Sequence, residues 1–507
     1  MSSPAQPLAE SLVQSVDWLA IAPPTVVAAV ALAVLVADLF VPEGRKALLG
    51  WASVAGLAAA ALLLLPLLDG DRSTFCLTGT PDVCSYTADR FTLVIQFLVL
   101  GGALLAALLS VTALKDARKD LPEGEYWFLL LSSAAGAELL PAARDLATLV
   151  VALEVASLPA FALVGLRRGD RRSSEAALKF FLSSVTATAV SLMGISFVYA
   201  ATGTLHLTRL ADRIQDVDGQ LQTLTQTGVV LTLVGFAFKT AAVPFHFWVP
   251  DTYIGAPLPV AAYLSVVGKA VGFTGLILVT VVALPSYADV WGPALAALAA
   301  LTMTVGNVGA LRQQATRAYS AVRLLAWSSV GQAGYLLVPI AAAAYSGDAE
   351  RSIGSTVAYA LMYGAVNLGA FAVAALVGRT KTLNRISDYR GLYARNPLSA
   401  LVLAFFLLCL AGLPPGIIGL FAKVTVFSAA VDAGLGWLAV VMAVNVVIAL
   451  FYYLQWTALL FRAPEGEEAR HLPVAPVTAA IALTGVIAVA LSGAPQLVLR
   501  FTDTGLF

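Results

Sequence analysis

The sequence predicts an all-α polytopic membrane protein with about fourteen transmembrane helices. Apolar residues make up 59% of the 507 residues and charged residues only 12%, whereas about 25% of the residues in soluble proteins are charged. Apolar runs long enough to cross a bilayer, which takes about 20 residues, follow one another with few breaks. The mean hydropathy of +0.86 agrees with this class. We therefore expect a single transmembrane domain over residues 1–507, embedded in the lipid bilayer.

The predicted spans are numbered along the chain, and each boundary is good to a few residues. They cover 18–40, 47–68, 88–114, 126–143, 145–166, 175–201, 227–248, 257–283, 291–311, 319–345, 353–378, 397–424, 434–461 and 472–499. The longest polar stretches between spans are 69–87, 202–226 and 379–396.

Basic residues predict the orientation of these spans. If the loops alternate and the N-terminus lies outside, inside loops hold 19 of the 30 Lys and Arg residues and outside segments hold 7. Positive residues concentrate on the cytoplasmic side of membrane proteins. We therefore expect a multi-pass protein of a bacterial plasma membrane with both termini outside.

Composition also limits the function. The formal net charge is zero, which gives no indication of nucleic-acid binding. The chain has three histidines and three cysteines, with no HExxH, CxxC or glycine-rich phosphate loop, so we expect no metal, iron–sulfur or nucleotide site. Cys76 and Cys84 share a loop predicted to lie outside, where they either form a disulfide or remain two free thiols. Cys409 lies in a span and is expected to serve packing.

Two spans are interrupted by proline. Pro244 and Pro250 follow Lys239 in span 7, and Pro414 and Pro415 precede Lys423 in span 12. Proline removes a backbone hydrogen bond from a helix. Freed backbone groups at membrane depth are tolerated only inside protein or along a wet cavity. A broken helix in each half of a chain indicates a transport site.

Four of the eight lysines, Lys179, Lys239, Lys269 and Lys423, fall inside predicted spans, together with Glu154. Each such charge costs roughly 2.5–3.5 kcal/mol at mid-span on insertion scales. The 22 arginines, in contrast, fall in loops or near span ends. A buried lysine can release and take up a proton, whereas arginine cannot. The contrast favours a proton pathway over fixed charges.

Glu154 and Lys239 each lack an oppositely charged residue within a turn on their own span. We expect them to contact each other across two helices, so that Glu154 holds and tunes Lys239. Two alternatives stay open. Glu154 can be protonated and hydrogen-bonded to backbone, and Lys239 can be a fixed counter-ion.

The other three lysines have alternative interpretations of their own. Gly268 and Gly272 leave room for helix packing or water beside Lys269, although this lysine can also extend to the membrane surface. Lys423 lies nearer a span end. Lys179 follows Glu175 by four residues, so an ordinary ion pair on a helix surface explains it almost as well.

Several further polar residues occur near these positions. His246 lies about two turns after Lys239 and is either a possible proton relay or a structural imidazole. Glu138 is expected to form a local ion pair with Arg144. A separate set of three amides is expected to form hydrogen bonds between helices, or else to bind water of the pathway: Asn307, Asn367 and Asn445.

Three segments resemble one known family. VPFHFWVPDTYIGAPLPVAAYLSVVGKA is similar to the broken helix 7 and helix 8 of the antiporter-like subunits of respiratory complex I. GNVGALRQQATRAYSAVRLLAWSSVGQAGYLL resembles their helix 9–10 region, and LAGLPPGIIGLFAKVTVFSAAV resembles their broken helix 12. The resemblance covers almost the whole chain. It is strongest to the N-type subunits, because the sequence ends after span 14 without the long lateral helix of L-type subunits.

This resemblance implies a fold and a role. It implies two inverted five-helix repeats, over about 126–283 and 291–461, and a mid-membrane row in which Glu154, Lys179, Lys239, Lys269 and Lys423 carry protons. It implies that NADH, FMN, iron–sulfur clusters and quinone bind to partner subunits, and that neighbouring membrane-arm subunits are the partners. Family members often have histidine where this chain has Gln332.

The hypothesis from the sequence is therefore a proton-translocating subunit of NADH:quinone oxidoreductase, a translocase with no redox chemistry of its own. One alternative is an Mrp-type cation/proton antiporter subunit. The other is a purely structural subunit of the membrane arm.

Overall fold

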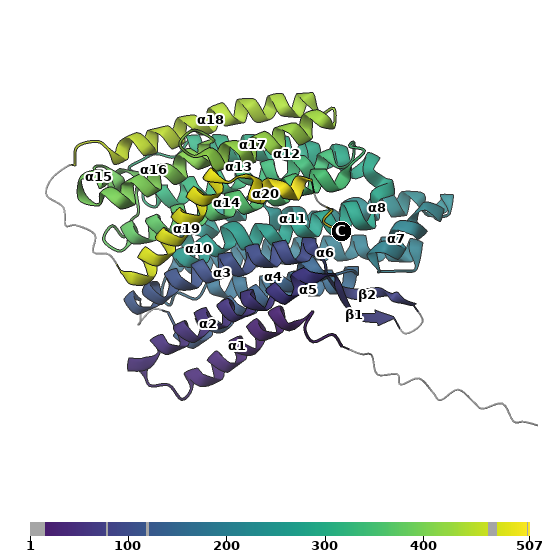
Figure 1. The fold of residues 1–507 in the computed structure, drawn as a ribbon, viewed down its shortest axis with the longest axis horizontal. Helices are drawn as coiled ribbons and strands as arrows, with labels where there is room; N and C mark the ends of the chain where they lie inside the picture. The colour runs from purple at the N-terminus through teal and green to yellow at the C-terminus, as the bar shows by residue number, and fades with distance from the viewer. Residues whose placement is uncertain (1–15, 78–79, 118–120, 465–473, 504) are drawn as a thin grey trace, which may run out of the picture.

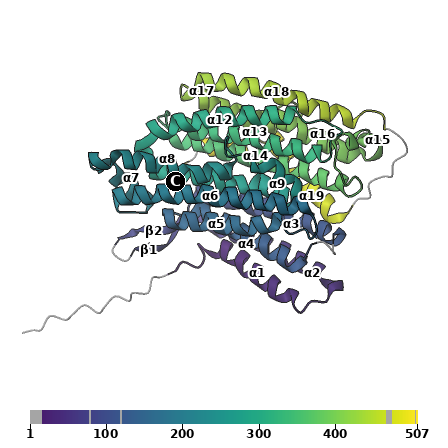
Figure 2. The same cartoon turned by 180° about the vertical axis from the view of Figure 1, so that it is seen from behind.

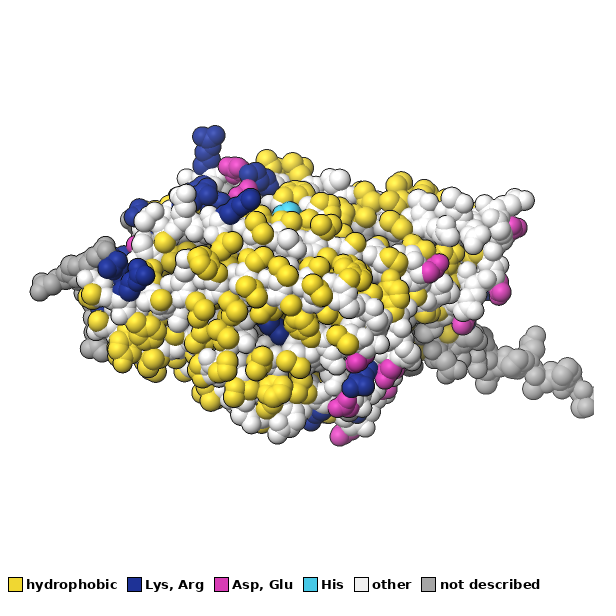
Figure 3. All heavy atoms as spheres, turned by 90° about the horizontal axis from the view of Figure 1, so that it is seen from above, with side chains coloured by type: hydrophobic (Ala, Val, Ile, Leu, Met, Phe, Trp, Pro, Cys, Tyr) yellow, Lys and Arg dark blue, Asp and Glu magenta, His cyan; other side chains and the backbone are white. Residues whose placement is uncertain are grey.

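A computed structural model describes residues 16–507 apart from 78–79, 118–120, 465–473 and 504. The described chain forms one bundle of helices that run roughly along the long axis of Figure 1. The chain progresses through the bundle from α1 and α2 on one side to α18 on the opposite side, as the reverse view in Figure 2 also shows. Apolar side chains cover the middle of the face drawn in Figure 3.

The helices agree closely with the predicted spans. Their bounds are α1 Ala22–Asp38, α2 Ala47–Leu63, α3 Arg90–Asp116, α4 Glu123–Ala142, α5 Leu146–Val164, α6 Arg171–Thr202, α8 Gln222–Thr240, α9 Trp248–Gly255, α10 Leu258–Tyr263, α11 Lys269–Ile277, α12 Ala288–Leu311, α13 Ser320–Ala342, α14 Ala349–Gly378, α16 Pro397–Ala411, α17 Ile417–Asp432, α18 Gly436–Leu460 and α19 Ala475–Gly493. Three short helices complete the set: α7 Leu207–Arg213, α15 Leu392–Arg395 and α20 Gln496–Leu499.

The prediction of a mostly helical membrane protein is confirmed. Within the described residues, 11 helical segments are long and apolar enough to cross a membrane, and Ala22–Asp38 and Pro397–Ala411 are shorter apolar helices. The number fourteen stays a prediction, because span 12 is divided between α16 and α17. Segment Leu258–Ala283 joins α10 and α11 through a π-helical turn, Leu264–Gly268.

Aspartates mark where several helices begin. Each accepts a hydrogen bond from a backbone N–H of the first turn, which satisfies a donor that the helix leaves free. The residues are Asp89 for α3, Asp145 for α5, Asp170 for α6 and Asp348 for α14.

The polar stretch 69–87 contains a β-hairpin that the sequence analysis did not predict. Strands β1, Arg72–Leu77, and β2, Thr80–Ala88, pair antiparallel. The disulfide interpretation is confirmed, since Cys76 and Cys84 are opposite each other and bonded. Cys409 is buried, as expected.

Segments that were predicted to lie on the same side of the membrane contact each other at the same end of the bundle. At the hairpin end, Arg144 N donates to Ser85 O (2.9 Å) and Phe91 N donates to Leu506 O (3.0 Å). At the opposite end, Arg379 Nε lies 2.7 Å from Asp116 Oδ2. Most Lys and Arg side chains visible in Figure 3 lie toward this second end, which is the end of α15 in Figure 1.

Candidate proton pathway

Lys239 lies where the seventh span breaks. It is the second-last residue of α8, and Ala241 follows with a left-handed φ of +66°. The backbone groups freed by the break find partners: Val243 N donates to Thr302 Oγ1 on α12 (2.9 Å), and Trp248 Nε1 donates to Phe238 O (3.3 Å). The break is thus buried in protein, the condition under which irregular backbone is stable at membrane depth.

Aromatic rings surround the Lys239 ammonium group. The side chain is buried, with 5% exposure. Its Nζ lies 4.8 Å from the ring centre of Phe161, 5.2 Å from that of Phe180 and 5.7 Å from that of Phe238. Each ring face attracts a cation. Sequence analysis missed these rings, since phenylalanine in an apolar span gives no functional signal.

The direct ion pair expected between Glu154 and Lys239 is absent among the described residues, so that prediction is wrong. Glu154 is half-buried, and its Oε1 accepts a hydrogen bond from Thr188 Oγ1 on α6 (2.7 Å). Phe161, about two turns further along α5, places its ring against the ammonium group.

Lys179 lies on the exposed surface of this chain. Its side chain is 46% exposed and its Nζ lies 2.7 Å from Glu175 Oε1, the local pair left open from the sequence. Asp251 Oδ2 lies 2.9 Å from the same nitrogen. Asp251 belongs to α9, so the break after α8 brings a second carboxylate to Lys179.

Lys269 is the first residue after the π-helical turn of the eighth span. Its side chain is 2% exposed, and its amine has no hydrogen-bond partner among the described residues. A Cβ on Gly272 would lie 2.3 Å from Thr240 N, so this glycine permits close contact between α11 and the end of α8. It therefore serves the helix packing expected from the sequence.

Lys423 contacts the backbone at the second helix break, between α16 and α17. Its side chain is 5% exposed, and its Nζ donates to Ala411 O, the last residue of α16 (2.6 Å). The last carbonyls of a helix lack partners within the helix and attract cations. The broken helix therefore supplies the main ligand of this buried ammonium group.

A polar network begins beside Lys269. Asn367 Nδ2 donates to Ser265 Oγ (2.7 Å), four residues before Lys269. The Tyr363 hydroxyl lies 3.1 Å from both Ser265 O and Ser329 Oγ. Asn367 thus links helices, as predicted, at a site next to the buried lysine.

A second group of polar side chains leads toward Lys423. Gln332 accepts a hydrogen bond from Tyr359 and lies 3.5 Å from the Tyr453 hydroxyl, which also bonds Ser328. A cavity of about 20 Å³ is lined in part by Gln332, Tyr359 and Lys423, which is enough for one water molecule. Gln332, which stands where family members often have histidine, therefore belongs to the polar group beside Lys423.

The remaining predicted residues lie as follows. His246 is half-buried in the break between α8 and α9, with its ring centre 5.5 Å from that of Trp327. Asn307 Nδ2 donates to Asn445 Oδ1 (3.0 Å), which joins α12 to α18 as expected for hydrogen bonds between helices. No group of three or more His, Cys, Asp or Glu suited to a metal ion occurs among the described residues.

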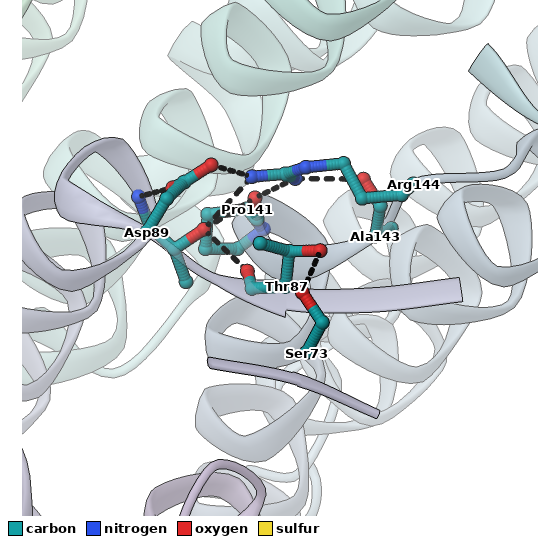
Figure 4. Close-up of polar contacts among 7 residues, drawn as sticks. Ser73, Thr87, Asp89, Pro141, Ala143 and Arg144 are labelled. Carbon is teal, nitrogen blue, oxygen red and sulfur yellow. Dashed lines mark hydrogen bonds and ion pairs between the residues drawn. The ribbon is translucent and has the colours of Figure 1, made fainter. Parts of the chain in front are cut away.

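The predicted ion pair between Glu138 and Arg144 is wrong. Arg144 pairs with Asp89 at the start of α3 and donates to Pro141 O (2.8 Å) and Ala143 O (2.9 Å), as Figure 4 shows. The chain leaves α4 in an extended conformation at Ala143, which directs Arg144 toward α3. Glu138 is instead fully buried.

Comparison with known proteins agrees with this geometry. The family model for NADH:quinone oxidoreductase/Mrp antiporter, TM, matches residues 143–449. NADH-quinone oxidoreductase subunit N 2 of Streptomyces griseus is 74% identical, over 98% of this chain and 96% of that protein.

Two solved structures resemble the chain. One chain of respiratory complex I from Thermus thermophilus with bound aureothin has a TM-score of 0.75 and 32% identity, over 94% of this chain and 98% of that one. A chain of the Mrp complex from Dietzia sp. has a TM-score of 0.82 over 96% of both chains, but at 22% identity the likeness is one of fold. Together with the family match and the close relative, these likenesses show that the chain belongs to the NADH:quinone oxidoreductase/Mrp antiporter family of transmembrane proteins.

Proposed function

We propose that this chain is subunit N of a proton-translocating NADH:quinone oxidoreductase, and that protons cross it along Glu154, Lys179, Lys239, Lys269 and Lys423. The observation that carries the proposal is the polar network that begins at Ser265, four residues before Lys269, and reaches a water-sized cavity lined by Tyr363 and Lys423. Such groups can pass a proton by hydrogen-bond exchange. Quinone reduction elsewhere in the complex supplies the energy.

The path has an order. Protons enter from inside near Lys179 and Lys239, Lys269 passes them along the row, and Lys423 loads the exit. Glu154 acts on Lys239 through space, since the two do not touch, and Thr188 holds its carboxylate. His246 is a possible relay at the first break.

The partners follow from this role. The neighbouring membrane-arm subunits adjoin the chain and lipid surrounds the assembly, while NADH, FMN, iron–sulfur clusters and quinone bind in other subunits. The exposed cluster of Lys179, Glu175 and Asp251 suits a polar contact with such a neighbour. A sealed subunit contact would also shield Lys179 from lipid.

The topology in the membrane is fourteen spans with both termini outside. It follows if α8 with α9, and α16 with α17, each count as one broken span, and if α4 crosses although it carries three glutamates. The two inverted repeats cover about 126–283 and 291–461. The two breaks support this symmetry, because each begins with a left-handed residue, Ala241 or Gly412.

Replacement of Lys239 by alanine tests the proposal. Lys239→Ala should lower the number of protons pumped per NADH oxidised in proteoliposomes, while the complex still assembles. Lys115→Ala is the matched control, because Lys115 is an exposed lysine at the end of α3. Normal pumping by an assembled Lys239→Ala complex would overturn the mechanism.

The same preparations separate the alternatives. An Mrp-type antiporter subunit would exchange sodium for protons, so the pumping signal would depend on a sodium gradient. A structural subunit would lose assembly in the alanine variants, but any assembled complex would keep its ratio of protons to electrons.

A further inference from the structure

Glu138 is a buried acid that the lysine row does not use. It lies four residues before the end of α4, with 0% exposure. Neither carboxyl oxygen has a hydrogen-bond partner among the described residues, and neither does the amide oxygen of the nearby Gln96. Buried structural polar groups are almost always hydrogen-bonded, and an unpaired buried carboxylate is strongly disfavoured. A purely structural role therefore accounts poorly for an acid at this position.

The groups on the outer side of Glu138 lead to the hairpin end. Gln96 Nε2 donates to the backbone oxygen of Glu138 (2.9 Å) and to the Tyr86 hydroxyl (3.3 Å). Tyr86 lies on β2, next to Ser85, whose backbone oxygen accepts a hydrogen bond from Arg144 N (2.9 Å). Gln96 and Tyr86 therefore link the backbone at Glu138 to the strand that contacts Arg144, which Figure 4 shows paired with Asp89.

On the inner side, polar groups lead toward the lysine row. The Tyr263 hydroxyl lies 2.9 Å from Ser133 Oγ, which is about a turn and a half before Glu138 on α4. Ser133 donates to Ala156 O on α5 (2.6 Å), two residues after Glu154. Tyr263 also lies on the same span as Lys269, about a turn and a half before it.

We propose that Glu138 is a proton-carrying residue on a branch that joins the lysine row to the hairpin end of the bundle, and that the Arg144–Asp89 pair closes this branch. The proposal rests on the proposed proton transport. A proton from the row binds one carboxylate oxygen of Glu138, and the same carboxyl group then releases it toward Tyr86 and the hairpin end. Tyr86, Tyr263, Asp89 and Arg144 are the ionisable groups around the path.

An isosteric change separates proton transfer from packing. Glu138→Gln keeps the size of the side chain but cannot carry a proton, so the assembled complex should pump fewer protons per NADH oxidised. Glu138→Asp retains the acid and should restore part of the ratio, which a packing role would not explain. An unchanged ratio in Glu138→Gln, or equal losses in both variants, would overturn the proposal.

Two more variants complete the test. Tyr263→Phe removes only the hydroxyl on the inner side and should also lower the ratio, and it decides the question if Glu138→Gln fails to assemble. An unchanged ratio in Tyr263→Phe would then refute the branch. Lys239→Ala is measured in parallel: if it loses pumping while Glu138→Gln keeps it, only the branch fails, whereas normal pumping in Lys239→Ala refutes the proposed function itself.

Discussion

Among the described residues, no carboxylate forms an ion pair with the buried ammonium groups. Lys239 faces aromatic rings, Lys423 donates to a helix-end carbonyl, and the Lys269 amine has no hydrogen-bond partner among the described residues. Removing one partner of a buried ion pair costs about 3–5 kcal/mol, because the other charge is left unpaired. Cation–π contacts are worth roughly 0.5–2 kcal/mol each, so a proton can pass along this row without breaking a strong pair.

Thr188 positions the acid of the row. Thr188→Val keeps the shape of the side chain but removes its hydrogen bond to Glu154, and a hydrogen bond to a charged group is worth about 1.5–3 kcal/mol. We expect proton pumping in proteoliposomes to fall severalfold. Thr186→Val is the matched control, because Thr186 is exposed on the same helix and donates to Leu182 O. Equal rates in the two variants would show that Thr188 does not support Glu154.

Sequence reasoning identified the charged residues better than their partners. Lysines in apolar runs are conspicuous because a charge there is costly. Tyr363 and Ser265 lie 98 residues apart in the chain, and neither residue type is unusual in a membrane helix, so their contact gave no signal. The sequence analysis paired Glu138 with Arg144 because the two residues are close in sequence. The true partner of Arg144 is Asp89, which lies 55 residues away in the chain.

At the level of elements, the two helix breaks follow from their prolines, and the structure adds what satisfies them. At the first break, the Thr302 hydroxyl accepts a hydrogen bond from Val243 N. At the second break, the Lys423 amine donates to Ala411 O. The hairpin was not predicted, because its strands are short and its sequence is mixed in polarity. Its register is held by the disulfide between Cys76 and Cys84.

Close contact between α12 and α13 depends on glycine. A Cβ on Gly306 would lie 2.2 Å from Gly331 N, so Gly306→Ala must push the two helices apart. Overpacking of this kind costs about 1–3 kcal/mol. We expect a lower thermal inactivation temperature of the purified complex. Gly101→Ala, on α3 with no atom within 4 Å of its added Cβ, should leave it unchanged, and equal temperatures for the two variants would contradict this account of the packing.

For the whole molecule, the ends of the bundle at which the loops lie agree with the two sides predicted from loop alternation and from the basic residues. Segments predicted for one side contact each other at the hairpin end, and basic loops gather at the other end. The sequence could predict this because charge bias is a property of loops and needs no tertiary contact. The way the helices pack against one another was beyond such reasoning, since nearly every span is apolar all round.

Labelling of introduced cysteines tests which end faces out. The native thiols give little background, because Cys76 and Cys84 are bonded and Cys409 is buried. Gly347→Cys, in an exposed loop after α13, and Arg168→Cys, in an exposed loop after α5, lie on opposite sides in the proposed topology. A membrane-impermeant maleimide should label Gly347→Cys in intact cells and label Arg168→Cys only after permeabilisation. The reverse pattern would mean that the basic loops face outward, against the charge bias that sets orientation in membrane proteins. The proposed entry of protons near Lys179 would then lie on the wrong side of the membrane.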